Sequence, residues 1–150
     1  SELPEVPDDA WTLFALAMKT ADVASVSDSG SLGMFELRPR RLADLGIMKN
    51  VKPGNARATG SMRWSGEWIP PLSQKKFLAS AEEQYKAFAA SMRKYLEALN
   101  SGAIKEEGDL STAGMLAVLH RCGPNGLKTW ATGERFEETI DLVNKTDGIF

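Results

Sequence analysis

The chain is organised around residues 26–46, whose sequence is Val26-Ser-Asp-Ser-Gly-Ser-Leu-Gly-Met-Phe-Glu-Leu-Arg-Pro-Arg-Arg-Leu-Ala-Asp-Leu-Gly46. Its serine, aspartate and glycine residues favour tight turns, so we expect an exposed loop over residues 28–31. Pro39 suits the first turn of a helix and the final glycine suits its end, which predicts a helix over residues 38–45. Glu36 lies among apolar residues between loop and helix. Its carboxylate is therefore expected to be either half exposed or chemically unusual.

Length and composition indicate one globular domain over residues 1–150, with residues 1–8 as an extended lead-in. The chain is 43% hydrophobic and 25% charged, which is ordinary for a protein that buries a core without disulfides or metal. A net charge of -2 provides no general attraction to phosphate, so we expect no nucleic acid partner. No apolar run is long enough for a membrane span. One cysteine and one histidine make no cluster of metal ligands, and we expect neither metal nor cofactor.

Helical periodicity dominates the rest of the chain, with apolar residues recurring every three or four positions. The pattern predicts helices over residues 8–21, 73–99, 112–120, 127–131 and 136–144. Ser73 is the expected N-cap of the long helix over residues 73–99. The segment 112–120 is nearly all apolar and should be buried, with a stop at Gly123-Pro-Asn-Gly126. These features predict an all-α fold.

Residues 48–72 form a long irregular segment in which the helical period is lost and glycine and proline recur. So long a segment is unusual in a compact domain unless it is functional, and it has room for a short β-ribbon within residues 48–68. It contains Trp64 and Trp68, four positions apart. Two tryptophans can form a stacking wall for a sugar or a base, or they can anchor the segment in the core. Both interpretations stay open.

Several separated motifs resemble the lysozyme-like superfamily, in particular phage virion-associated muramidases and soluble lytic transglycosylases. Residues 26–37 resemble a family loop of the form V-S/N-x-x-G-x-x-G, followed by two hydrophobic residues, glutamine, and leucine or phenylalanine. The other matching elements are Leu42-Ala-Asp-Leu-Gly46, Trp64-Ser-Gly66, Phe77-Leu78, Gln84, and the apolar segment 112–120 that ends in histidine before Gly123 and Gly126. The resemblance covers about residues 15–150 and implies a lysozyme-like helical domain.

The resemblance also implies cleavage of the glycan strand of peptidoglycan by a glutamate that acts as general acid. Such an acid needs a pKa raised by apolar surroundings. Its expected place falls on Met18, or with a small shift on Lys19 or Thr20, and none of these is a carboxylic acid. Glu36 instead occupies the position of the family's glutamine. By the same comparison, the substrate-binding residues are Ser27, Gly30, Gly33, Phe35, Trp64, Trp68, Gln84 and His120.

Three functions are compatible with this departure from the motif. In the first, the protein is a glycoside hydrolase or lytic transglycosylase that uses Glu36 as the acid, with Asp22 or Asp28 as a second carboxylate. In the second, it binds cell-wall glycan without cleavage, as a structural or glycan-binding module of a virion or secretion apparatus, with other proteins of that assembly as partners. In the third, only the fold is shared. The first two imply action on a virion, in the periplasm or outside the cell.

Two smaller groups of residues have alternative interpretations. Arginines near the central stretch can form a solvated helix face or flank an anionic polymer such as peptidoglycan, whose peptides carry carboxylates. These arginines are Arg38, Arg40, Arg41, Arg57 and Arg63. His120 and Cys122 are two positions apart and cannot face each other along a helix, so we expect a buried, hydrogen-bonded histidine rather than a thiol nucleophile.

Overall fold

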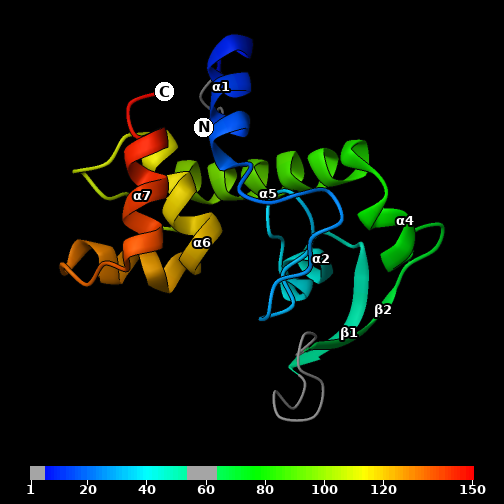
Figure 1. The fold of residues 1–150 in the computed structure, drawn as a ribbon. Coiled ribbons are helices and arrows are strands. Elements are labelled where there is room, and N and C mark those ends of the chain that lie inside the picture. The colour runs from blue at the N-terminus through cyan, green and yellow to red at the C-terminus, as the bar shows by residue number, and fades with distance from the viewer. Residues whose placement is uncertain (1–5, 54–63) are drawn as a thin grey trace. The chain divides into compact units, whose positions relative to one another are not determined.

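The computed structural model describes residues 6–53 and 64–150, and these residues are mostly helical with a small two-stranded antiparallel sheet (Figure 1). The elements in chain order are α1 (Asp8–Met18), α2 (Pro39–Asp44), β1 (Met48–Pro53), β2 (Trp64–Trp68), α4 (Gln74–Leu78), α5 (Ala81–Ser101), α6 (Thr112–Ala131) and α7 (Glu137–Thr146). The mainly helical class is confirmed, and a β-ribbon is present where the sequence left room for one. Arg57, Arg63 and the first five residues of the lead-in lie outside the described residues.

The chain divides into two compact units, which are described separately here. The ribbon unit comprises residues 20–91, and the terminal unit comprises residues 1–19 and 92–150. The helix α5 contributes its first part to the ribbon unit and its second part to the terminal unit. The expectation of a single domain stays a prediction.

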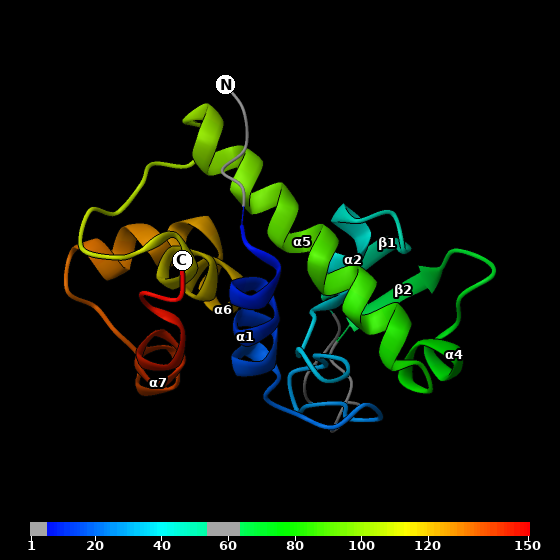
Figure 2. The same cartoon turned by 90° about the horizontal axis from the view of Figure 1, so that it is seen from above.

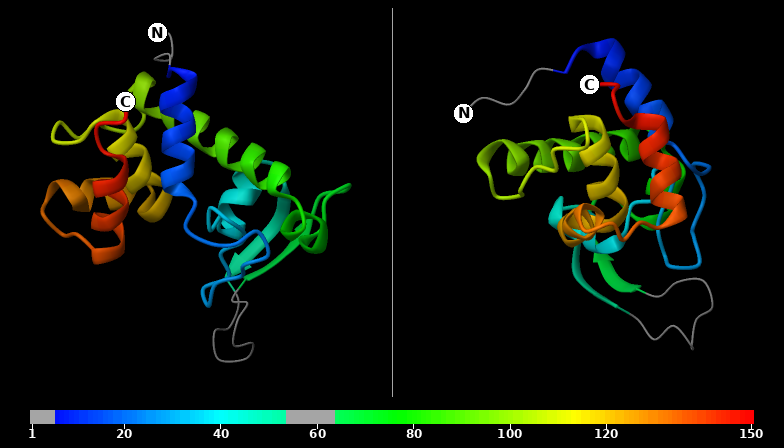
Figure 3. Two further views of the ribbon diagram at one scale, coloured as in Figure 1. Left: turned by 45° about the horizontal axis from the view of Figure 1, so that its top comes forward. Right: turned by 90° about the vertical axis from the view of Figure 1, so that its left-hand side faces the viewer.

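The ribbon unit contains the two strands, which lie side by side in both views of Figure 3. Met48 pairs with Trp68 and Pro53 with Trp64, and the register shifts between Lys49 and Lys52. The helix α2 packs against β1. The irregular segment predicted over residues 48–72 is therefore largely strand where it is described. The buried apolar side chains of the ribbon unit are Leu32, Met34, Phe35, Leu37, Leu42, Met48, Phe77, Ala87 and Phe88.

The long helix predicted over residues 73–99 is two helices, and Figure 2 shows α4 set at an angle to the start of α5. Ser73 is confirmed as a cap, since its hydroxyl accepts a hydrogen bond from the N–H of Lys76 at 3.2 Å. Ser80 does the same for the N–H of Glu83 at 3.1 Å. A serine followed three residues later by glutamate favours a new helix start, so the prediction of one continuous helix was wrong because it overlooked this second cap.

The terminal unit is built from α1, α6, α7 and the second part of α5, with α7 packed against both α1 and α6 (Figure 1). Residues 113–119 are all buried, as their apolar sequence predicted. Gly123 has φ 74°, a conformation that favours glycine, and it kinks α6 at the predicted stop. The helix resumes at Pro124 rather than at Leu127, because proline suits a first helical turn.

Several helix ends differ from their predicted positions by up to three residues. The first helix ends at Met18 rather than at residue 21, because Lys19 is already extended. Beyond it, the N–H groups of Thr20 and Ala21 both donate to the carbonyl of Met34. The last helix runs from Glu137 to Thr146 instead of over residues 136–144. Tertiary contacts therefore determine ends that periodicity locates only approximately.

Ser111 joins the start of α6 to the turn after α7. Its hydroxyl accepts hydrogen bonds from the N–H of Gly114 at 3.1 Å and from the N–H of Gly148 at 2.7 Å. We predict that Ser111→Ala lowers the free energy of unfolding by about 1–2 kcal/mol, since both N–H groups lose this acceptor. Urea denaturation measures the change. Ser101→Ala, at an exposed serine, is the matched control and should cost less than about 0.5 kcal/mol. Equal losses for the two variants would contradict the double role of Ser111.

Candidate functional site

A buried glutamine holds the central loop in the ribbon unit. The side chain of Gln84 is 0% exposed, and its Oε1 accepts a hydrogen bond from the N–H of Met34 at 2.9 Å. Its Nε2 donates to the carbonyls of Val23 and Phe77, both at 2.8 Å. Both donors of the amide are therefore used, which determines its orientation. One side chain on α5 thus connects the loop, the segment before it and the end of α4.

Two short antiparallel bridges, Val26 to Leu32 and Leu32 to Leu37, fold the loop back on itself. At its centre, Gly33 has φ +75°, and a Cβ there would lie 2.4 Å from Oε1 of Gln84. A larger residue at this position would be strained by its backbone and would also collide with the amide. The glycine and the glutamine, which come from separate sequence motifs, therefore depend on each other.

The turn that precedes these bridges is only partly exposed. Asp28 and Ser29 are exposed as predicted, but Gly30 and Ser31 are buried. The hydroxyl of Ser27 accepts a hydrogen bond from the N–H of Ser31 at 3.0 Å. The prediction of an exposed loop over residues 28–31 was wrong for its second half, because the bridge to Leu32 draws those residues inward.

Glu36 lies at the end of the loop with its carboxylate half exposed. Its Oε2 accepts a hydrogen bond from the hydroxyl of Thr20 at 2.6 Å. Its φ of 50° lies in a region that residues other than glycine adopt rarely. The sequence indicated Thr20 only as a shifted position of the expected general acid, and its contact with Glu36 was not predicted. Of the two alternatives predicted for Glu36, half exposure is the one observed.

The two tryptophans of β2 have different surroundings. The indole Nε1 of Trp64 donates to the carbonyl of Ser29 at 3.0 Å, which ties the ribbon to the loop. The guanidinium carbon of Arg40 lies 5.5 Å from the centroid of the Trp64 ring. Trp68 instead packs against the buried Phe77, with ring centroids 5.4 Å apart. Both tryptophans are half exposed, but Trp64 is held at the loop whereas Trp68 packs against a core residue.

Several residues predicted to bind substrate are buried and support the loop. Phe35 stacks on Phe88 with ring centroids 4.1 Å apart and an interplanar angle of 11°. Phe35 is 3% exposed, and Gly33 and Gln84 are also buried. These three residues therefore present no open face to a ligand. Ser27 and Trp64, which are half exposed, are better placed for contact.

Met18 and His120 belong to the terminal unit, whereas the loop belongs to the ribbon unit. Met18 is the last residue of α1 and is 1% exposed. Its thioether has no acidic proton to donate. His120 is half buried rather than fully buried as predicted. The thiol of Cys122 lies 3.3 Å from the hydroxyl of Thr139, which is a structural contact.

The arginines of α2 divide into one with a structural role and others that are exposed. Arg41 is half buried, and its Nε and Nη2 donate to Oγ and the carbonyl of Ser91 at 2.6 and 2.9 Å. It also forms an ion pair with Asp44 at 3.5 Å. The prediction that Arg41 lies on a solvated face was therefore wrong, because it connects α2 to α5. Arg38 and Arg40 are exposed as predicted.

No protein-family model matches the chain, and neither a curated protein nor a solved structure does. The site is therefore interpreted from its own geometry. Over residues 6–53 and 64–150, no three histidine, cysteine, aspartate or glutamate side chains are grouped so that they could hold a metal ion. In the same part of the chain, no helix has the length and apolar character needed to cross a bilayer.

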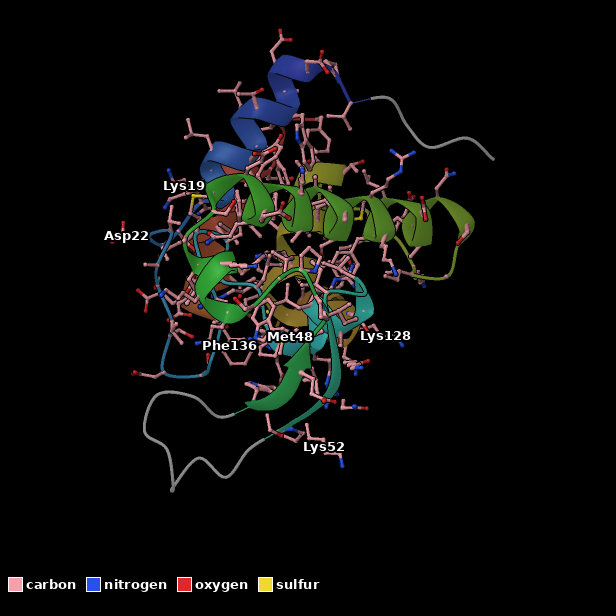
Figure 4. All side chains as sticks on the ribbon, turned by 90° about the vertical axis from the view of Figure 1, so that its right-hand side faces the viewer. Lys19, Asp22, Met48, Lys52, Lys128 and Phe136 are labelled. Atoms are coloured by element: carbon pink, nitrogen blue, oxygen red, sulfur yellow. The ribbon has the colours of Figure 1, made fainter. Side chains whose placement is uncertain are left out.

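The other acidic candidates and a cavity of the terminal unit do not add to this site. Asp22 and Asp28 are exposed, and Figure 4 shows Asp22 directed outward. A cavity of about 280 Å³ lies in the terminal unit and contains none of the predicted site residues. It is lined by Ala103, Ile104, Lys105, Glu106, Glu107, Pro124, Leu127, Lys128 and Ala131. The candidate site surface consequently comprises two sets of contacts made by the loop: Glu36 with the hydroxyl of Thr20, and the carbonyl of Ser29 with Trp64, over which Arg40 lies.

Sequence motifs indicated Glu36 and Trp64, but they did not indicate all of this surface. The contribution of Ser29 is a backbone carbonyl, for which no side-chain signal exists. Thr20 meets Glu36 only because the segment at residues 20–21 is hydrogen-bonded to Met34. Arg40 was predicted, but as one of several equivalent arginines.

Replacing Gln84 with leucine tests the structural role of the buried side-chain amide. The change keeps a similar volume but leaves the N–H of Met34 and the carbonyls of Val23 and Phe77 without these partners. We predict a loss of about 2–4 kcal/mol in the free energy of unfolding, measured by urea denaturation. Gln74→Leu, at the half-exposed first residue of α4, is the control and should cost less than about 1 kcal/mol. A Gln84→Leu protein as stable as this control would contradict the role given to the amide.

Proposed function

We propose that the protein is a lysozyme-like domain that binds the glycan strand of peptidoglycan without cleaving it. The observation that carries the proposal is the half-exposed indole of Trp64, held by Ser29 beside the loop of residues 26–37. Aromatic faces pack well against the apolar faces of sugar rings, while neighbouring polar groups bind hydroxyl groups. Thr20 and Glu36 supply such polar groups in the same unit.

The relation between Gly33 and Gln84 gives further support. Gly33 and Gln84 belong to two separate motifs of the lysozyme-like resemblance. They are 51 residues apart in the sequence, and here they are in direct contact. The loop motif and the glutamine motif therefore function as one structural unit. A lysozyme-like fold is the simplest reason for both motifs to occur in one chain, and it is part of the proposal.

The chemistry of the candidate acids supports the proposed absence of cleavage. A general acid must give a proton to the glycosidic oxygen, and a second carboxylate or a water must complete the reaction. Met18 cannot supply that proton. Oε2 of Glu36 is an acceptor in its contact with Thr20. A domain that retains glycan binding but not cleavage suits a structural role in a virion or secretion apparatus, where it would dock other proteins on the cell wall.

Cleavage by Glu36 is the second candidate function. Its uncommon positive φ favours this alternative, because unusual backbone conformations recur at active sites. Its half-exposed carboxylate is also accessible to a substrate. In this alternative Glu36 protonates the glycosidic oxygen, and the reaction is hydrolysis or transglycosylation of peptidoglycan.

Replacing Trp64 with alanine tests glycan binding. We predict that Trp64→Ala weakens binding to soluble peptidoglycan strands by about 3- to 10-fold, the loss expected from one aromatic contact. Isothermal titration measures the dissociation constant. Phe136→Ala removes an aromatic side chain that is 70% exposed in the terminal unit, and it should leave the affinity unchanged. If both variants bind like the original protein, Trp64 is not part of a glycan site.

An assay of peptidoglycan release separates binding from cleavage. We predict that the protein releases no soluble fragments from purified peptidoglycan at any pH between about 4 and 8, where a carboxylic acid could act. Glu36→Gln keeps the size of the side chain and should also leave binding within about twofold. Release of fragments by the original protein that disappears in Glu36→Gln would establish the second candidate function instead.

A further inference from the structure

We infer that Arg40 makes this site selective for glycans that carry carboxylates over neutral glycans with the same backbone. The inference rests on the proposed function, because it concerns the surface beside Trp64. It goes further by naming the chemical class of glycan and the residue that recognises it. Three observations carry it: the charge of the ribbon unit, the position of Arg40, and the separate role of Arg41.

The two units have opposite net charges, although the chain as a whole carries only -2. Residues 20–91 contain ten lysine or arginine and seven aspartate or glutamate residues, a net charge of +3. The remainder contains eight basic and thirteen acidic residues, a net charge of -5. The unit that holds Trp64 therefore carries the net charge that attracts anions, and such a charge raises the local concentration of an anionic polymer.

Arg40 places this charge at the aromatic surface itself. Its guanidinium carbon lies 5.5 Å from the centroid of the Trp64 ring, within the range of a cation–π interaction. The ring thereby helps to position a planar group whose N–H donors match the two oxygens of a carboxylate. Trp64 is in turn held by the carbonyl of Ser29, so the cation and the stacking surface are positioned together.

Among the described cations of the ribbon unit, Arg41 and Lys52 have surroundings different from those of Arg40. Arg41 is committed to Ser91 and is paired with Asp44. Lys52 pairs with Ser65, next to Trp64 in the ribbon, and is exposed; Figure 4 shows its side chain projecting outward. It adds to the positive charge of this end of the ribbon. Arg40 lies over the indole ring, which places it where it can meet a sugar packed on Trp64.

Two glycans with the same β-1,4 backbone provide the test. Chitohexaose is neutral, whereas peptidoglycan strands freed of peptide carry a lactyl carboxylate on every second sugar. Isothermal titration of each glycan into the full chain gives the ratio of the two dissociation constants. We expect about tenfold tighter binding of the carboxylate-bearing strand, the size of one charge-assisted contact. Arg40→Gln should remove this preference and change the affinity for chitohexaose by less than about twofold.

Lys75→Gln is the matched control, since it removes one exposed positive charge from the same unit. It should keep the preference within about twofold, whereas Arg40→Lys, which keeps the charge but not the planar group, should retain part of it. The inference is overturned if Arg40→Gln weakens the binding of both glycans equally or of neither. It is also overturned if Arg40→Gln and Lys75→Gln change the preference equally. Tighter binding of a single-stranded oligonucleotide than of the carboxylate-bearing strand would also overturn it. If the original protein binds neither glycan, the proposed function fails as well, and the two failures are thereby distinguished.

Discussion

The buried side-chain amide of Gln84 is the constraint on which the ribbon unit depends. It donates to Val23 and Phe77 and accepts from Met34, so one planar group determines the positions of three backbone segments. A buried amide is stable only when its polar atoms are paired, and this requirement works in both directions. The N–H group of Met34 in the loop needs the amide oxygen as its acceptor, and the buried amide oxygen needs this N–H group as its donor. Gly33 lies so close to the amide that no side chain fits between them.

The arrangement of the site follows from this loop. Once Met34 is held, its carbonyl accepts hydrogen bonds from the N–H groups of Thr20 and Ala21, and the hydroxyl of Thr20 then reaches Glu36. In the same loop, the carbonyl of Ser29 accepts a hydrogen bond from the indole of Trp64. The candidate site is therefore held by hydrogen bonds to and within the loop. Such a surface can present a sugar with a fixed pattern of hydrogen-bonding groups.

The resemblance to lysozyme-like proteins and the loss of the expected acid have to be considered together. Fold does not determine activity, and one missing carboxylate is sufficient to remove general acid catalysis. Nothing in the contacts of Trp64, Ser29 or Arg40 requires that acid, so the proposed binding does not depend on it. The opposite charges of the two units add a physical reason for an anionic ligand to approach the ribbon unit. For these reasons we favour glycan binding over glycan cleavage.

Local sequence signals were sufficient for most of the helices, for the cap at Ser73, and for the break near Gly123, because caps and glycine act within a few residues of their own position. The same kind of signal at Ser80 and Glu83 was present but overlooked. The roles of Arg41 and of the two tryptophans could not be predicted in this way. Arg41 bonds to Ser91, 50 positions away, and Trp64 bonds to Ser29, 35 positions away. Composition and periodicity carry no information on such pairs, since they depend on which backbone groups the folded chain leaves within reach. The tertiary structure alone decided that Glu36 would meet Thr20 and that Arg40 would lie over Trp64.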